Sequence, residues 1–208
     1  MYPSVRAAFR AFNETFEGVV PWMYLDIKGL VTVGVGNLID PIELALHLPF
    51  RFRNEPNLAA TTEEIEAEWR CIKANTALAR AGHKACEPLT QLALDEVAID
   101  ALIATKLAEN EAILKESEFF QGFDSWPADA QLGLLSMAWA LGPNGPKRFQ
   151  KFAEACRNLD FVRAADNCAI NAKGNPGIVP RNLANRTLFE TAGQGPGTGD
   201  LSVLRYLP

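Results

Sequence analysis

The sequence predicts an α+β fold that is predominantly α, in a single domain of 208 residues. The β part rests on residues 22–26 and 30–35, two short segments of β-forming residues joined by a turn that contains Gly29. The α part rests on longer segments whose apolar residues recur at helical spacing, at residues 4–17, 62–83, 94–115, 128–141, 147–157, 160–171 and 180–192.

The first helix has a clear beginning, apolar face and end. Ser4 can cap its N-terminus, and Gly18 offers a stop. Its large apolar residues are spaced by four, three and four positions and so share one face: Val5, Phe9, Phe12 and Phe16. Glu17 is therefore expected at the end of a helix, and Asp26 at the end of a strand beside the hairpin turn.

The remaining segments carry weaker local signals. Thr62 and the carboxylates that follow it predict the start of a helix. The nearly apolar residues 128–141 predict a helix that is buried on most sides. Residues 38–60 are expected to be irregular because prolines interrupt them, and the glycine-rich residues 193–200 are expected to be mobile or loosely packed.

Composition excludes several classes of protein. With 48% hydrophobic and 22% charged residues, the chain can bury a core and is not disordered. No apolar run approaches the roughly 18 residues of a membrane helix, and the N-terminus lacks the apolar core of a secretory signal, so we expect delivery by another route. The net charge of −5 argues against nonspecific binding to nucleic acid.

The charge is unevenly distributed along the chain. Residues 58–118 hold 12 acidic and 6 basic groups, whereas residues 124–208 hold 7 acidic and 9 basic groups. The C-terminal part is therefore the better candidate for contact with an anionic polymer.

Cysteine and histidine give no support for a metal or cofactor. The four cysteines match neither a CxxC redox pair nor a zinc knuckle, and we expect reduced, mostly buried thiols. A disulfide between Cys156 and Cys168 is the alternative. His47 and His83 are far apart in sequence, so no metal site is expected.

Two carboxylates and a hydroxyl are the candidates for chemistry. Enzymes that cleave glycosidic bonds usually use a pair of carboxyl groups, one of which is protonated and acts as the general acid. Glu17 is the better acid because its neighbours are apolar, whereas Asp26 lies at a turn beside a lysine. Thr32 could hold a water or orient Asp26. On spacing alone, a surface glutamate and a turn aspartate are the commoner explanation.

A denser pattern includes these three residues. Glu17-Gly18, Tyr24-Leu25-Asp26, Gly29 and Thr32-Val33-Gly34-Val35-Gly36 follow one another at fixed separations. The pattern resembles the signature of the phage-type lysozyme family, E-G, a gap, Y-x-D, x-x-G, x-x-T-x-G-x-G.

The resemblance implies a peptidoglycan muramidase. By the family's mechanism, Glu17 would be the general acid in hydrolysis of the β-1,4 bond between N-acetylmuramic acid and N-acetylglucosamine. Asp26 and Thr32 would position the attacking water, with inversion. The carboxyl separation expected for that mechanism is roughly 6.5–9.5 Å.

The resemblance covers roughly four fifths of the chain. "DEVAIDALIATKLAENEAIL" resembles the family's linking helix, "LLSMAWALGPNG" its buried C-terminal helix, and "GIVPRNLANRTLF" its closing segment. It implies an N-terminal lobe at 1–93, a linking helix at 94–116, a helical lobe at 117–192 and a tail at 193–208. Residues 40–92 are covered least and are expected to enlarge the N-terminal lobe.

The resemblance also suggests supporting residues. Arg181 would support the catalytic glutamate, and Tyr24, Gly36 and Asn37 would line or support the substrate site. Several positions depart from the family's pattern. Asn37 stands where some members carry His, Asn182 and Asn185 stand where Arg and Glu are usual, and Ala140 stands where some carry a cleft Gln.

Other functions remain open at this point. A lytic transglycosylase would need a single glutamate and no attacking water, and a catalytically inactive wall-binding module would need no triad at all. A muramidase of this kind would act in the bacterial periplasm or cell wall as a monomer, without nucleic acid or membrane. It would be either a phage endolysin or a secretion-system effector, and an effector would need a delivery apparatus and an immunity protein.

Overall fold

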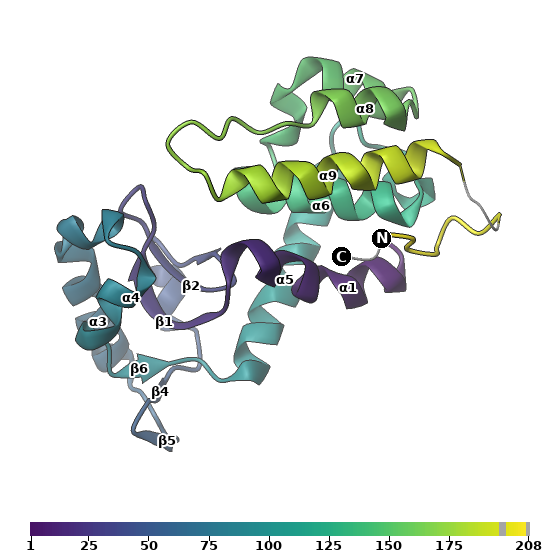
Figure 1. Ribbon diagram of the computed structural model, residues 1–208. Coiled ribbons are helices and arrows are strands. Elements are labelled where there is room, and N and C mark those ends of the chain that lie inside the picture. Colours follow the sequence, from purple (N-terminus) through teal and green to yellow (C-terminus); the bar gives the residue numbers. More distant parts are fainter. Residues whose placement is uncertain (196–198, 207–208) are drawn as a thin grey trace. The chain divides into compact units, whose positions relative to one another are not determined.

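The computed structural model describes residues 1–195 and 199–206, and it has the predicted α+β fold, with 57% helix and 10% strand in small antiparallel sheets. The chain divides into two compact units (Figure 1). One unit comprises Glu17–Ala104, and the other comprises Met1–Phe16 together with Thr105–Pro208. The expected single lysozyme-like domain with lobes at 1–93 and 117–192 stays a prediction.

The unit Glu17–Ala104 contains both sheets. The first has the order β1 (Val20–Leu25), β2 (Val31–Gly34) and β3 (Asn37–Leu38), and the second has the order β5 (Glu55–Ala59), β4 (Arg51–Phe52) and β6 (Leu92–Ala93). Its helices are α2 (Glu43–Leu46), α3 (Thr62–Ala74) and α4 (His83–Cys86), with 3-10 turns at Thr76–Arg80 and Glu87–Leu89.

The predicted hairpin is confirmed, but residues 38–60 are more regular than predicted. They contain α2, β4 and β5. These elements have two to five residues, which is too short for a periodic pattern to show in sequence. Pro56 is compatible with β5 because that strand lies at the edge of its sheet.

The helix predicted at 62–83 begins at Thr62 as predicted, but it is shorter, and its cap lies one residue earlier than proposed. Thr61, not Thr62, is the N-cap, and it forms a capping box with Glu64. The helix ends at Ala74, where Asn75 donates from its backbone to Ile72 O and leaves the helical conformation. The apolar stripe of α3 ends at the same place, so nothing extends its packing further.

The second unit is built from helices. These are α1 (Pro3–Glu17), whose last residue belongs to the other unit, the later part of α5 (Glu96–Lys115), α6 (Ala128–Leu141), α7 (Gln150–Arg157), α8 (Phe161–Asn167) and α9 (Ile178–Gly193). A further 3-10 turn lies at Phe123–Ser125 and another at Pro146–Arg148. α9 packs against both α6 and α8.

The prediction that residues 128–141 form a buried helix is confirmed, since every residue of α6 from Ala128 to Ala138 is buried. The approach of α9 is close. A Cβ on Gly133 would lie 2.9 Å from the Phe189 ring, so the glycine is needed for this packing.

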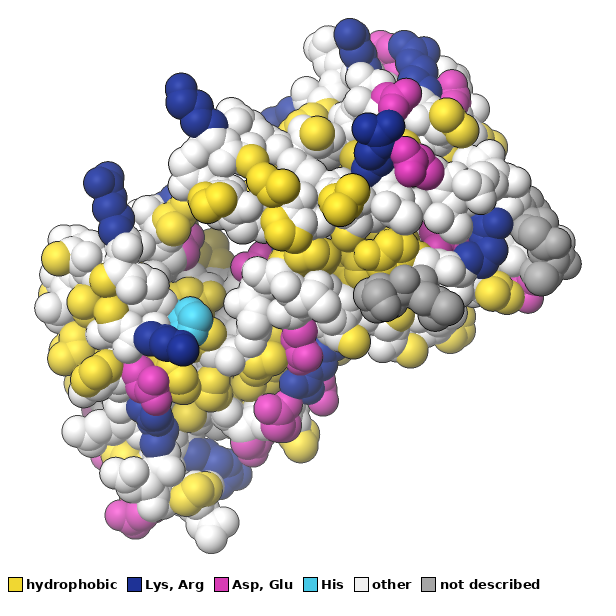
Figure 2. All heavy atoms as spheres, in the orientation of Figure 1, with side chains coloured by type: hydrophobic (Ala, Val, Ile, Leu, Met, Phe, Trp, Pro, Cys, Tyr) yellow, Lys and Arg dark blue, Asp and Glu magenta, His cyan; other side chains and the backbone are white. Residues whose placement is uncertain are grey.

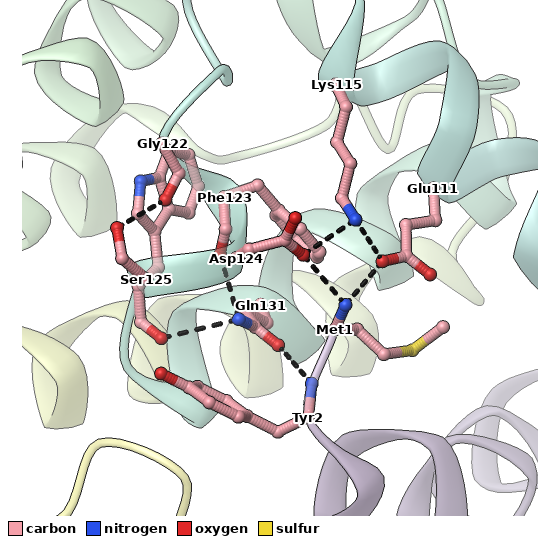
Figure 3. Close-up of polar contacts among 10 residues, drawn as sticks. Met1, Tyr2, Glu111, Lys115, Gly122, Phe123, Asp124, Ser125 and Gln131 are labelled. Atoms are coloured by element: carbon pink, nitrogen blue, oxygen red, sulfur yellow. Dashed lines mark hydrogen bonds and ion pairs between the residues drawn. The ribbon is translucent and has the colours of Figure 1, made fainter.

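The N-terminal ammonium lies in a cluster of charges (Figure 3). It donates to Glu111 and Asp124, and Lys115 Nζ lies 2.6 Å from a carboxylate oxygen of each. Partial burial raises the pKa of Glu111, but the two cations outweigh it and hold that pKa below its usual value. The cluster joins the start of α1 to α5.

Two residues that follow the glycine-rich segment bond to the start of α6. Leu201 O accepts a hydrogen bond of 2.8 Å from Ala128 N. Tyr206 N donates to the buried Asp129 carboxylate at 2.7 Å. These bonds satisfy polar groups at the start of α6. Part of the glycine-rich segment 193–200 lies outside the described residues, and its expected loose packing stays a prediction.

All four cysteines are free, and three are buried. Cys156 and Cys168 are not joined, so the disulfide alternative is not formed. Burial raises the pKa of the Cys156 thiol well above its usual value and that of Cys168 to about 11. Both are therefore thiols at neutral pH.

Neither a membrane-spanning helix nor a metal-binding cluster is found among the described residues. No described helix is both long and apolar enough to cross a bilayer. Within the described residues, no group of three or more His, Cys, Asp or Glu side chains could hold a metal ion. On the face drawn in Figure 2, acidic and basic side chains are interspersed.

Glu68 is a buried carboxyl that affects stability. It is 9% exposed, and Gln91 N and Leu92 N donate to its Oε2 at 2.6 and 3.1 Å. Burial raises the pKa of Glu68 above its usual 4.5, although those two bonds and the charge of Arg53 oppose the shift. Folding therefore shifts the equilibrium of Glu68 toward its protonated form relative to the unfolded chain.

Replacing this carboxyl changes how stability depends on pH. At pH values between the pKa of Glu68 in the unfolded chain and its higher pKa in the folded protein, the folded state binds more protons. The contribution of Glu68 to the free energy of unfolding therefore falls as the pH rises through this range. Glu68→Gln keeps the acceptor but cannot ionise. In urea unfolding at pH 4 to 8, the free energy of unfolding of Glu68→Gln should improve relative to wild type as pH rises. A pH-independent difference between the two proteins would contradict this account.

Candidate active site

The carboxyl of Glu17 is packed against a glycine of the β2–β3 turn. Gly18, with φ of +68°, ends α1 directly after Glu17. A Cβ built on Gly36 would lie 3.2 Å from Glu17 Oε2, and Gly36 itself has φ of +71°. Position 36 therefore requires glycine twice, for its backbone conformation and for the space that the carboxyl occupies.

The turn that carries Gly36 is held by Asn37. Asn37 is 3% exposed, and its Oδ1 accepts a hydrogen bond of 3.1 Å from Val35 N. The same oxygen would lie 3.0 Å from a Cβ on Gly34, whose φ is +67°. Asn37 Nδ2 is buried without a hydrogen-bond partner among the described residues. Asn37 thus supports the turn rather than reaching solvent.

Asp26 is fixed by the hairpin turn. Its Oδ1 accepts hydrogen bonds from Lys28 N at 2.8 Å and Leu30 N at 2.9 Å. This is the turn that an aspartate typically forms with the backbone two residues ahead. Asp26 Oδ2 has no hydrogen-bond partner among the described residues, so one oxygen positions the side chain and the other can accept a bond from a bound molecule.

Thr32 lies on the same face of the first sheet as Tyr24. The two residues are paired across β1 and β2, and paired side chains of an antiparallel sheet point to the same side. Thr32 is 4% exposed, and its hydroxyl donates to Leu30 O at 3.2 Å. Its oxygen keeps acceptor capacity, because a hydroxyl both donates and accepts.

Tyr24 lies within electrostatic reach of both carboxylates. Burial raises the pKa of its phenol, and the charges of Glu17 and Asp26 raise it further. The residues of the motif therefore share one environment within the unit Glu17–Ala104, although Glu17 comes from a helix and Asp26 from a hairpin turn.

A clamp that sequence analysis missed holds the hairpin from α3. Lys73 Nζ donates to Gly29 O at 2.9 Å and to Asp40 Oδ2 at 2.5 Å. The same Asp40 oxygen accepts from Val31 N at 3.1 Å. Lys73 and Asp40 are 33 residues apart, and no periodic pattern relates them.

Arg181 belongs to the other unit and is 1% exposed. Its Nη1 donates to Asn13 Oδ1 at 2.7 Å and to Ser136 Oγ at 3.0 Å, and its guanidinium lies 4.7 Å from the centre of the Phe16 ring. A buried guanidinium with these partners helps to hold α1, α6 and α9 together. Its expected support of Glu17 stays a prediction.

The tryptophans divide into core and partly exposed residues. Trp69 and Trp126 are buried, at 7% and 1% exposure, as expected for core packing. Trp22 is only half-buried and lies on β1 near Tyr24. The contact between Trp22 and His83 could not be predicted, because nothing in the sequence connects positions 22 and 83.

Comparison with known proteins does not assign the chain to a family. No protein-family model matches the chain, and a search of curated proteins finds no significant match. The arrangement of the site therefore has to be interpreted from its own residues.

The contact between Glu17 and Gly36 can be tested by adding one methyl group. Gly36→Ala should displace the Glu17 carboxyl and lower hydrolysis of purified peptidoglycan by about 100-fold, since small displacements of reacting groups can cost that much. The backbone should lose about 1 kcal/mol of stability because alanine must adopt positive φ.

Gly29→Ala is the matched control. Gly29 has φ of +75°, but a Cβ added there would have no atom of another residue within 4 Å, its chain neighbours aside. The variant should lose a similar free energy of unfolding while retaining most activity. Equal activity of Gly36→Ala and Gly29→Ala would show that the contact with Glu17 is unimportant.

Proposed function

We propose that this protein is a muramidase that hydrolyses the β-1,4 bond between N-acetylmuramic acid and N-acetylglucosamine in bacterial peptidoglycan. The observation that carries the proposal is the arrangement of Glu17, Asp26 and Thr32 around Tyr24. Glu17 lies against Gly36, Asp26 is fixed with one oxygen unoccupied, and Thr32 projects from the strand beside Tyr24. These positions of the residues that the phage-type lysozyme resemblance singles out support the proposal.

In this proposal Glu17 donates a proton to the oxygen of the leaving sugar. The half-buried position of its carboxyl at the end of α1 limits its motion, because Gly36 closes one side. After the bond breaks, Glu17 is left as a carboxylate. The C1 carbon of the muramic acid gains the hydroxyl of water.

Asp26 and Thr32 hold the attacking water in this mechanism. Asp26 accepts a hydrogen bond from the water through its unoccupied oxygen and takes up the proton as the new C–O bond forms. The Thr32 hydroxyl supplies a second, neutral contact that fixes the direction of attack. Because Asp26 Oδ1 is already bonded to two backbone N–H groups, its carboxylate need not reorganise during the reaction.

The proposed substrate also sets where the protein acts. Peptidoglycan lies in the periplasm and cell wall, so a phage endolysin or an antibacterial effector is the biological role that we propose. Lys147, Arg148 and Lys151 are exposed near the start of α7 and could contact the carboxylates of wall peptides. An effector of this kind would need an immunity protein in the cell that produces it.

Replacement of Glu17 tests the proposal directly. Glu17→Gln should reduce the release of soluble fragments from purified peptidoglycan to background, because an amide of the same shape cannot donate the proton. Glu14→Gln is the control, since Glu14 lies one turn earlier on α1 and its carboxylate bonds to Arg10 Nε at 2.5 Å. We expect Glu14→Gln to retain wild-type activity. Activity of Glu17→Gln near that of wild type would refute the assignment.

The two residues proposed to hold water should differ in severity. Asp26→Asn should lower the rate by at least about 100-fold because the amide cannot take up the proton, in the range of one general base. Thr32→Ala should lower it by about tenfold, the size of one lost hydrogen bond. Initial rates with circular dichroism spectra would check both. An Asp26→Asn protein as active as wild type would rule out its role as base.

A further inference from the structure

An aromatic cluster that includes Tyr24 links the first sheet to the start of α4. Trp22 and Tyr24 lie on either side of the buried Met23 in β1, and both are only partly buried. Both contact the imidazole of His83, with ring centres 6.5 Å apart for Trp22 and 6.0 Å apart for Tyr24. The second contact is edge-to-face, at an interplanar angle of 69°. The face that carries Tyr24 thus continues into the start of α4.

The cluster is held rigidly by polar contacts around it. Trp22 Nε1 donates to His83 O at 3.3 Å. The guanidinium of Arg53 lies 4.9 Å from the centre of the Trp22 ring, and Arg53 Nη2 is in turn 2.6 Å from Glu87 Oε1. The indole is therefore fixed through its N–H and through one neighbouring cation.

The rings of this cluster are nevertheless available to a ligand. Trp22, Tyr24 and His83 are each only half-buried. Neither the imidazole of His83 nor the phenol of Tyr24 has a hydrogen-bond partner among the described residues. A core cluster would bury its rings fully and satisfy all of its polar atoms, whereas here the rings are partly exposed and the imidazole and phenol are without partners among the described residues.

The chemistry of these side chains suits a neutral sugar. A pyranose has an apolar face of C–H bonds that packs on an aromatic ring, and a rim of hydroxyl and acetamido groups that bond to polar side chains. Small-molecule sites combine aromatic walls with a few polar groups in this way. The only cation of the cluster within the described residues, Arg53, is already paired with Glu87, so the cluster offers little to a free anion.

We propose that Trp22, Tyr24 and His83 form a sugar-binding subsite that holds a ring of the glycan strand beside the bond to be cleaved. This inference rests on the proposed muramidase function. The ring packs on the exposed parts of Trp22 and Tyr24, and His83 hydrogen-bonds to a hydroxyl or acetamido group. His83 is supplied by residues 40–92, the segment that the lysozyme resemblance covers least, so this chain would have gained the subsite with its enlarged N-terminal lobe.

The test measures substrate affinity separately from turnover. With soluble, uncrosslinked glycan strands as substrate, His83→Ala should raise KM by about tenfold, the size of one lost hydrogen bond with part of a packing contact. The fall in kcat should be much smaller, because His83 touches no reacting atom. His83→Gln should recover part of the affinity through its amide. His47→Ala is the matched control because His47 is exposed and directly follows α2, and it should match wild type.

Binding to an inactive protein separates the two proposals. Calorimetric titration of Glu17→Gln with a soluble glycan fragment should show binding that His83→Ala weakens by about tenfold in the double variant. If wild type hydrolyses the strands but His83→Ala has an unchanged KM and affinity, the subsite is wrong and the muramidase stands. If fragments bind through His83 without hydrolysis, the muramidase is wrong and the subsite stands. If fragments neither bind nor are cleaved, both are wrong.

Discussion

The packing of the Glu17 carboxyl against Gly36 is the constraint on which the candidate site depends. It brings Glu17 against the turn between β2 and β3, so that a side chain at position 36 would require the carboxyl to move. The positive φ of Gly36 also favours glycine, so the backbone conformation and the contact with Glu17 select the same residue type. The other residues of the site, Asp26 and Thr32, are positioned by the short sheet that carries this turn.

That sheet is small, and its stability comes from outside it. An isolated hairpin is marginal in water, and packing against a helix is needed to fix it. Here α3 supplies the support, since Lys73 bonds to Gly29 O and Asp40, and Trp69 Nε1 donates to Ile39 O at 2.9 Å. The segment that enlarges this unit therefore holds the hairpin in addition to carrying His83. A site of three short strands can be rigid when its turns are held in this way.

Much of the fold could be predicted from sequence because its strongest elements carry local signals. The hairpin is marked by β-forming residues around Gly29, and α6 by an almost unbroken apolar run, and both formed as predicted. The second sheet could not be predicted, because strands as short as Arg51–Phe52 have no detectable period. The order of the C-terminal segment depends on long-range bonds to α6, such as the one to Ala128, which local composition does not reveal.

In the candidate site, too, residues close together in sequence could be predicted, whereas distant ones could not. Glu17, Asp26 and Thr32 lie within 16 residues, so a local motif could identify them as candidates. Their supports come from far along the chain. Lys73 lies more than 30 residues beyond the hairpin that it clamps, and His83 lies 61 residues beyond Trp22. Such pairs are brought together only by the packing of α3 and α4.

The most direct measurement is the chemical structure of the ends that the wild-type protein generates in purified peptidoglycan. Digestion would be carried out in water enriched in heavy oxygen, and the fragments would be analysed by mass spectrometry. If Asp26 and Thr32 hold the attacking water, the new ends should be reducing N-acetylmuramic acid residues that carry one heavy oxygen. Fragments that end in 1,6-anhydro-muramic acid, with no oxygen from the solvent, would contradict the proposed mechanism, and a complete lack of fragments would contradict the function.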